Sequence, residues 1–227
     1  MRTDPTTRVL LRSGDTLIAL LVTEAYIETL NRIQLQKVVY LMDAVSHLYA
    51  FRPPREAHVI YKRGPYDLCL QNAVDALAFR GLISVTDVDK RRGGAMAVTY
   101  ALNTTGRACA TQLIQEQAFS AKHRVAQNVA ENIHRLGWDH LVRLVYAEPT
   151  FARTRLGGYG QRLFLNDGAK CSATFLTTTI ARAVLDGLDA TLDPSLLVRV
   201  FFDYLAEYAR LSQQSNHDDN VQVWGDE

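Results

Sequence analysis

The chain has 227 residues, of which 48% are hydrophobic and 22% charged, and its formal net charge is +1. This composition is typical of a globular protein and excludes a disordered, collagen-like or coiled-coil chain. Residues 211–227 hold four acids and no Lys or Arg, so removing their −4 leaves +5 for residues 1–210. A mildly basic body of this kind suits weak contact with nucleic acid or an acidic partner.

The sequence also bears on cellular location. No apolar run approaches the ~20 residues that a membrane-spanning helix needs. The N-terminal stretch lacks the continuous apolar region of a secretion signal. The three cysteines are widely spaced and form no CxxC motif, which favours reduced thiols over disulfides or a zinc site. We therefore expect a cytoplasmic protein without membrane contact.

Two helices are predicted near the N-terminus. The first spans residues 13–30, where Ser13 or Asp15 would cap the helix and apolar residues recur at helical spacing. The second spans residues 33–50, with one apolar stripe and a pair of prolines beyond its end. Residues 56–61 follow as a short extended segment.

A third helix and a β-hairpin come next. The turn sequence KRGPY places Pro65 in the first turn of a helix over residues 66–80. Residues 82–88 and 95–103 alternate apolar and polar side chains on either side of the turn sequence DKRRGG, which is the pattern of a β-hairpin. Three helices followed by a ribbon with a basic tip predict an N-terminal winged helix-turn-helix module over residues 13–105.

The second half is predicted to be all-helical, so the fold class is mainly α. It would form a helical domain over residues 106–212, followed by an acidic flexible tail over residues 213–227. Ser172 would cap one of its helices. The glycine-rich segment 149–170 is long for a compact domain and is expected to be functional or to contain a short strand or turn. The predicted helices of this half span residues 105–117, 120–136, 138–147, 171–187 and 194–212.

Two stretches carry a recognisable pattern, RIQLQKVVYLMDAV and VIYKRGPYDLCLQNAVDALAFRGLISV. The residues that define it are Leu35, Gln36, Lys37, Tyr40, Tyr61, Lys62, Gly64, Pro65, Gly81, Leu82 and Ile83. With this pattern, residues 15–105 resemble the SocA-type antitoxin family (the Panacea domain) and the YwgA-like winged-helix proteins. A looser match is to accessory subunits that act beside ABC ATPases in defence cassettes.

The resemblance implies a non-enzymatic adaptor or accessory subunit of a bacterial toxin–antitoxin or defence system. Such a protein would bind a partner encoded nearby, such as a toxin, an ATPase or an effector. Weak nucleic-acid contact without sequence preference is a separate expectation, which rests on the basic residues described next. The long helical second half departs from the compact antitoxin form.

The hairpin tip is one candidate for binding phosphate. Lys90, Arg91 and Arg92 place three cations on an exposed turn, where they could contact a nucleic-acid backbone. The alternative is a solvated hairpin tip whose charge serves solubility.

The segment TFARTRLGGYGQR is a second candidate. It brings Arg153, Arg155 and Arg162 close to glycines whose N–H groups could approach an anion. The alternative is a flexible connection whose arginines pair with Glu148 and Asp167.

Two helices carry candidate partner-binding residues. Gln71, Asn72 and Asp75 give the third helix an acidic polar face, which is unfavourable against phosphates and favours a protein partner. Phe201 and Tyr204 belong to aromatics that surround the last helix, which indicates burial on more than one side, in the core, in a homodimer or against another partner.

Local signatures of catalysis are absent from the sequence. The six histidines show no metal-binding spacing, and no nucleophile motif is present, so we predict no catalytic residue, metal or cofactor. Two rival functions stay open. One is a dimeric winged-helix DNA-binding transcriptional regulator, and the other is a nucleic-acid or nucleotide processing enzyme.

Overall fold

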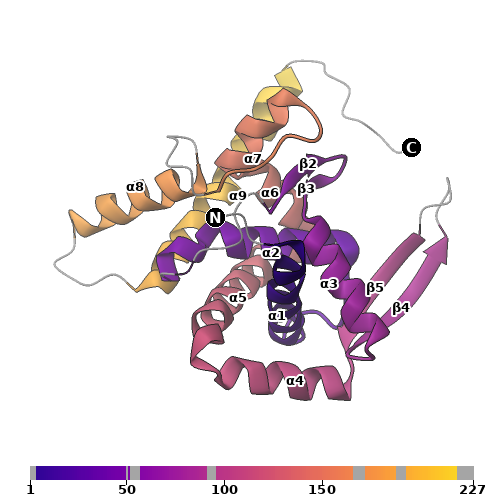
Figure 1. Ribbon diagram of the computed structural model, residues 1–227. Coiled ribbons are helices and arrows are strands. Elements are labelled where there is room, and N and C mark those ends of the chain that lie inside the picture. The colour runs from indigo at the N-terminus through magenta and orange to yellow at the C-terminus, as the bar shows by residue number, and fades with distance from the viewer. Residues whose placement is uncertain are drawn as a thin grey trace.

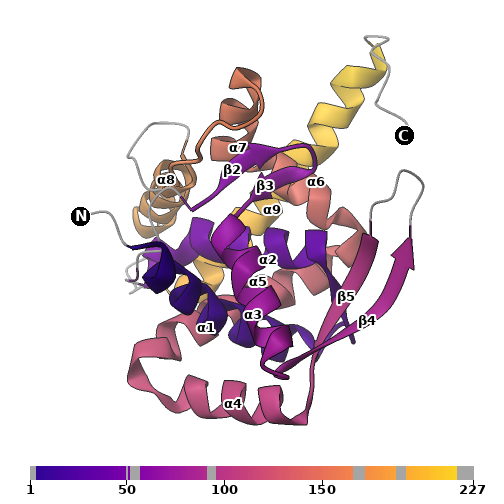
Figure 2. The same ribbon diagram turned by 45° about the vertical axis from the view of Figure 1, so that its right-hand side comes forward.

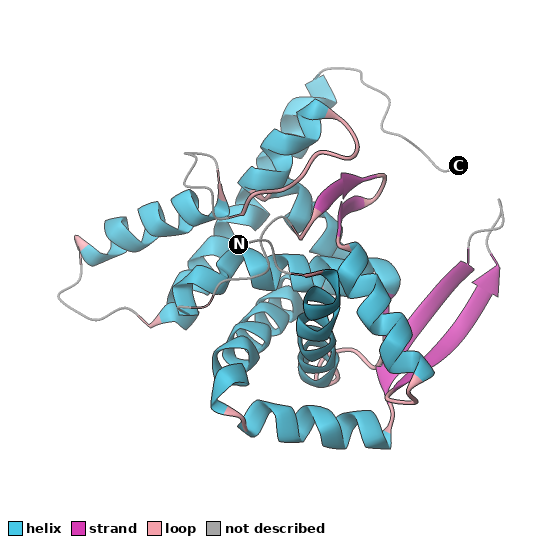
Figure 3. Cartoon of the chain, in the orientation of Figure 1, coloured by secondary structure: helices cyan, strands magenta, loops and turns pink. Residues whose placement is uncertain are grey.

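The computed structural model describes residues 4–49, 51, 57–90, 96–165, 172–187 and 193–218. Within these ranges the fold is mainly helical, as predicted, with two small antiparallel sheets (Figures 1 and 3). The helices gather in the centre, and a two-stranded ribbon projects from one side of them (Figure 1).

The first helix, α1 (Pro5–Thr23), begins and ends earlier than predicted. Asp4 caps it, because its carboxylate accepts hydrogen bonds from the first-turn N–H groups and Pro5 occupies a position where its missing N–H costs little. The predicted caps, Ser13 and Asp15, therefore lie inside the helix. Asp15 was misinterpreted because a carboxylate held by a buried cation looks the same in a sequence as a capping carboxylate.

The second helix agrees closely with its prediction. The short strand β1 (Leu30–Asn31) leads into α2 (Arg32–Val45), and the 3-10 helix η1 (Ser46–Tyr49) extends it. A capping box fixes the start of α2, since Asn31 and Gln34 each accept a hydrogen bond of 2.9 Å from the other's backbone N–H.

A small hairpin separates α2 from the third helix. It consists of β2 (Val59–Tyr61) and β3 (Gly64–Tyr66), and β2 confirms the last three residues of the extended segment predicted over residues 56–61. Pro65 lies in β3 and not in the third helix, so that prediction was wrong. The third helix, α3 (Leu68–Phe79), starts two residues later than predicted, after the capping residue Asp67.

The predicted β-hairpin is confirmed. Strands β4 (Ile83–Lys90) and β5 (Met96–Leu102) pair antiparallel, with an irregularity beside Asp87, whose φ is +49°. The short β1 adds to the outer edge of β5, which gives the sheet order β1-β5-β4.

The second half is helical, as predicted, and its segment 149–170 contains short elements. α9 extends six residues past the predicted end at residue 212 to Asp218, while residues 219–227 of the predicted tail lie outside the described ranges. The elements of this half are α4 (Thr104–Gln115), α5 (Gln117–Leu136), η2 (Trp138–His140), α6 (Leu141–Ala147), α7 (Pro149–Thr154), η3 (Arg155–Gly157), α8 (Ala173–Leu185) and α9 (Pro194–Asp218).

One hydrophobic core joins the two halves. α2 lies in the middle of the molecule (Figure 2) and contacts α1, α5, α6 and α8. Its residues from Leu35 to Val45 are all buried. The core therefore includes residues on both sides of the domain boundary that we predicted near residue 105. The division of the chain into two domains stays a prediction.

Candidate functional site

The solvent-exposed side of α3 combines apolar and acidic residues. Leu68, Asn72, Asp75 and Phe79 follow one another at helical spacing and are all exposed, and we call this stripe the outer face of α3. Phe79 is 94% exposed and Leu68 is 61% exposed, the former being the most exposed large hydrophobic residue among those described. The stripe contains no Lys or Arg, although the exposed Arg80 follows Phe79 directly as the C-cap of α3.

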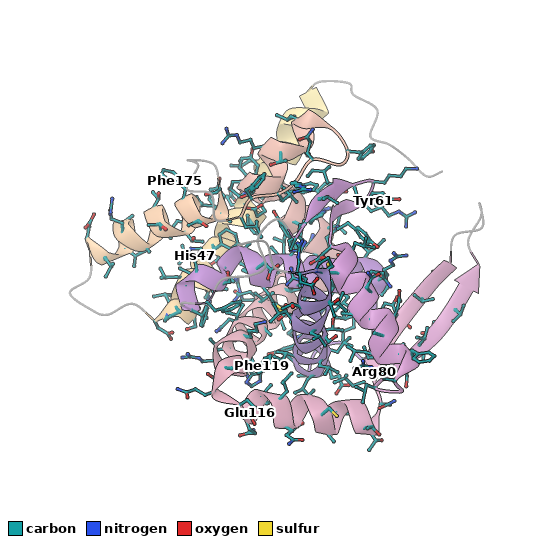
Figure 4. All side chains as sticks on the ribbon, viewed as in Figure 1. His47, Tyr61, Arg80, Glu116, Phe119 and Phe175 are labelled. Carbon is teal, nitrogen blue, oxygen red and sulfur yellow. The ribbon has the colours of Figure 1, made fainter. Side chains whose placement is uncertain are left out.

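The strand that follows α3 also bears exposed apolar side chains. β4 contacts α3, and its residues Val85 and Val88 are exposed. Arg80, labelled in Figure 4, marks the point where α3 ends beside the β4–β5 ribbon. Exposed apolar side chains that gather on neighbouring elements are typical of protein-binding surfaces.

Gln71 occupies a different place from the one predicted. Its side chain is buried and donates a hydrogen bond of 2.8 Å to Asp75 Oδ1. Of the three predicted partner-binding residues on α3, Asn72 and Asp75 therefore lie on the outer face and Gln71 lies beneath it.

A buried ionic cluster holds α3 against the core. The guanidinium group of Arg12 is fully buried and donates to three carboxylates, at 2.7 Å to Asp67, 2.8 Å to Asp15 and 2.5 Å to Asp43. Lys122 from α5 adds a second cation, 2.5 Å from the other oxygen of Asp15. This cluster joins α1, α2 and α5 to the start of α3.

Asp43 is the centre of this cluster. Burial alone would raise the pKa of Asp43, but Arg12 and the imidazole of His58, which lies 2.8 Å away, lower that pKa to about 2. Three carboxylates face two cations here, and His58 adds a third when it is protonated. The imidazole of His58 and the carboxylates of the cluster are almost completely buried. This burial is typical of residues that stabilise a fold.

Asp67 fixes the first turn of α3. Its Oδ1 accepts from the N–H groups of Cys69 at 2.8 Å and Leu70 at 3.3 Å, while its Oδ2 binds Arg12. Gln36 pairs with the backbone of Asp67 through two hydrogen bonds, of 2.8 and 3.0 Å. Gln36 was one of the residues that carried the family resemblance, and these contacts explain its role in positioning α3.

Two more residues of the resemblance make buried contacts. The hydroxyl of Tyr40 donates to Glu148, a fully buried carboxylate that also caps α7. Burial raises the pKa of Glu148, although these hydrogen bonds oppose the rise. The ammonium group of Lys37 donates to the backbone oxygen of Arg63 in the β2–β3 turn.

Sequence reasoning missed the ionic cluster. Its members come from residues spread between positions 12 and 122, so no local motif exists. The available signal was charge inside apolar stripes, such as Asp43 within the buried run of α2.

The predicted glycine-rich segment pairs with the edge of strand β2. Arg162 bridges to Val59 of β2, and backbone hydrogen bonds join Gln161 and Gly160 to Ile60 at 2.8 Å each. The N–H of Gly158 donates to Arg155. The N–H groups of Gly158 and Gly160 are therefore used within the fold. Phosphate binding by this segment stays a prediction.

The three arginines of this segment are exposed on different elements. Arg153 lies on α7, Arg155 lies on η3 and Arg162 lies on the segment beside β2. The guanidinium of Arg155 lies 6.0 Å from the centre of the Tyr146 ring. Glu148 was expected to pair with them, but it binds Tyr40 and the start of α7 instead, so that alternative was wrong for Glu148. Asp167 lies outside the described residues.

The remaining candidates fall in varied places. Phe201 is completely buried in the core, so it is not available to a partner, and its prediction as a contact was wrong for that reason. Tyr204 is partly exposed and stacks with Tyr208. Lys90 ends β4, while Arg91 and Arg92 lie outside the described residues.

No family model matches the sequence, and a search of curated proteins found no match. The resemblance to SocA-type antitoxins therefore stays a prediction.

Among the described residues, no group of three or more His, Cys, Asp or Glu side chains is arranged to hold a metal ion. None of the helices in the described part of the chain has the length and apolarity that crossing a membrane requires.

Proposed function

We propose that this protein is a non-enzymatic adaptor or accessory subunit that binds a protein partner through the outer face of α3 and the adjoining strand β4. The observation that carries the proposal is the exposure of Phe79 and Leu68 on a helical stripe that contains no cation. Burying an exposed side chain of this size in a partner contributes ~1.5–3 kcal/mol, and aromatic residues are enriched at energetically dominant positions of interfaces.

The proposal includes a winged-helix identity for the N-terminal half. The element order α1, β1, α2, α3, β4, β5 and the sheet order β1-β5-β4 support it, with the β2–β3 hairpin inserted before α3. In a winged helix that binds DNA, the third helix enters the major groove. Here the outer face of α3 offers a carboxylate and bare apolar groups, which favour protein over phosphate.

The buried ionic cluster supports a structural interpretation of the charged core. Catalytic acids and bases need access to a substrate, whereas Arg12, Asp43 and His58 are each at most 3% exposed. Their hydrogen bonds instead set the position of α3 relative to α1 and α2.

The biological setting of the proposal comes from the family resemblance. The partner would be the product of a neighbouring gene in a bacterial toxin–antitoxin or defence cassette, and the complex would act in the cytoplasm.

Co-purification tests the proposal. A tagged copy expressed in the native host should retain the product of an adjacent gene, and Phe79→Ser should reduce the retained amount about tenfold or more. Leu156→Ser is the matched control, because Leu156 is 84% exposed and lies on η3, away from α3. Equal retention by the wild type and Phe79→Ser, or equal loss in Leu156→Ser, would contradict the proposal.

A dimeric DNA-binding regulator is the second candidate, and the winged-helix element order favours it. It predicts tight binding to one palindromic duplex with a large ratio over random duplex. The adaptor predicts a ratio near one. Charge reversal at Lys90, Arg91 and Arg92 tests any backbone contact separately, since it should abolish binding at low salt if the ribbon tip touches phosphates.

A further inference from the structure

A pocket of about 240 Å³ lies between the start of α2, the β2–β3 hairpin and strand β5. Its lining includes three cationic residues, Arg32, Lys37 and Arg63, and contains no Asp or Glu. The apolar part of the lining comes from Ile33, Pro65 and Val98 and from two tyrosine rings. Figure 4 labels one of these tyrosines, Tyr61, at the hairpin.

The three cations lack anionic partners within the described residues. Arg32 donates a hydrogen bond of 2.9 Å to the hydroxyl of Tyr66, and its guanidinium lies 5.6 Å from the centre of that ring. Lys37 donates to a backbone oxygen. None of the three forms an ion pair in the part of the chain that the structure describes. Like charges gathered without a counter-charge repel one another, so this pocket favours an anion.

Lys37 is the buried cation of the pocket lining. Its side chain is buried, and burial lowers its pKa to about 7. The groups around it are Arg32 and Gln36 on α2, Arg63 on the hairpin and Tyr146 of α6, which lies beside Gly64, and none of them is an acid. An anion bound beside this ammonium group would supply the negative charge that no residue of the pocket lining provides.

The position of Gly64 makes room for the lysine. Its φ is +104°, and a Cβ there would meet the Lys37 Nζ at 2.2 Å. Only glycine tolerates both conditions. The conformation of the hairpin turn and the position of the buried Lys37 ammonium group therefore both depend on glycine at position 64.

The start of α2 points positive charge toward the same region. The pocket lining includes Asn31, Arg32 and Ile33, which are the cap and first residues of this helix. The N-terminus of a helix carries about half a positive charge and favours phosphate groups. This adds to the three cations and does not stand alone.

Two tyrosine rings form an aromatic wall. Tyr61 and Tyr66 lie with ring centres 5.5 Å apart, and Tyr61 is 55% exposed. Nucleic-acid bases stack on exposed aromatic rings regardless of base identity. The pocket volume of about 240 Å³ lies just below the range of about 300–1,000 Å³ that is usual for organic ligands, so the pocket suits one nucleotide unit better than a dinucleotide.

We propose that this pocket binds a mononucleotide, with its phosphate at the three cations and its base against the two tyrosine rings. This inference goes beyond the proposed function and does not depend on it, because the outer face of α3 shares no residue with the pocket.

Calorimetric titration of the full chain tests the proposal, with AMP, UMP, adenosine and inorganic phosphate as the probes. AMP and UMP should bind with similar affinity, because stacking is insensitive to base identity. Inorganic phosphate should bind more weakly than either nucleotide, and adenosine should not bind measurably.

Two neighbouring variants distinguish the pocket from general surface charge. Arg63→Gln should weaken AMP binding about tenfold or more, since one charge-assisted contact to phosphate is lost. Lys62→Gln is the matched control, because Lys62 is exposed in the same turn but does not line the pocket. Circular dichroism checks that both variants fold.

Several results would overturn the proposal. One is that neither nucleotide gives a binding signal at about 10 mM, a concentration well above a weak Kd of about 1 mM. The others are equal affinity for AMP and adenosine, and equal affinity for AMP and inorganic phosphate. An equal loss of affinity in Arg63→Gln and Lys62→Gln would overturn it as well.

Discussion

Replacing Arg12 by Met removes the cation that joins three buried carboxylates, while it keeps a flexible apolar side chain of similar length. Arg12 donates to Asp15, Asp43 and Asp67, and its guanidinium group is fully buried. Removing one partner of a buried ion pair costs about 3–5 kcal/mol, because the remaining charges stay desolvated and uncompensated. For a chain of this size, each kcal/mol lowers Tm by about 2–4 °C, so the expected drop is about 6–20 °C.

The assay is urea and thermal unfolding, followed by circular dichroism. Arg107→Met is the control, because Arg107 pairs with Glu24 on the surface, where its side chain is 51% exposed. Surface ion pairs contribute little, so this variant should unfold like the wild type. A loss of about 0.5 kcal/mol or less in Arg12→Met would refute the reasoning, since that is the range of an ordinary surface substitution.

The pH dependence gives the same prediction a second readout. The folded pKa of Asp43 is lowered from 3.8 to about 2, so its ionised form stabilises the fold above pH about 4, and this contribution of about 2 kcal/mol is lost as pH falls through about 2. Without Arg12 the folded pKa of Asp43 should rise. The stability gap between wild type and Arg12→Met should therefore narrow as pH falls from about 4 to about 2, and a gap independent of pH would contradict this account.

Three further predictions concern the pocket and the outer face of α3. Gly64→Ala should destabilise the fold by about 1–3 kcal/mol in urea unfolding, because φ is +104° and the new Cβ would clash with Lys37; unchanged stability would show that the turn adapts. Because burial lowers the folded pKa of Lys37 from 10.5 to about 7, the unfolded chain binds more protons between these values, so stability should rise from pH about 7 to pH about 9. Lys37→Met should flatten that rise, and an identical rise in this variant would refute the assignment. Phe79→Ser should leave Tm within error, because Phe79 is 94% exposed, while it reduces partner retention; a large drop in Tm would instead indicate a structural role.

The elements with strong local patterns were predictable. The period-2 alternation on both sides of a turn located the β4–β5 hairpin, and Ser172 was identified as a cap, which its hydrogen bond of 3.1 Å from the N–H of Phe175 confirms. Both signals depend on residues within a few positions of one another. They could therefore be recognised without knowledge of the tertiary structure.

The boundaries near charged residues were less predictable. Asp4 and Pro5 mark the start of α1. Ser13 and Asp15 are also residue types that commonly cap helices, and they precede a longer apolar run. Which carboxylate caps a helix depends on whether a distant cation, here Arg12 or Lys122, holds the other one. A single sequence does not contain that information.

The candidate sites show the same limit. The acidic character of α3 was visible in the sequence, yet the exposure of Phe79 depends on which face of α3 packs against α1. The pocket collects cations from α2 and from the β2–β3 turn. Lys37 and Gly64 were both noticed as parts of the family pattern, but their contact became apparent only when the hairpin was seen to fold over α2.

Hydrogen–deuterium exchange on the purified complex tests the central claim, which is that the outer face of α3 and strand β4 bind a protein. The peptides that cover residues 68–88 should exchange more slowly when the co-purified partner is bound. They should exchange at the rate of the free protein when random duplex DNA is added instead. Unchanged exchange in these peptides with the partner bound, or slower exchange with DNA alone, would contradict the claim.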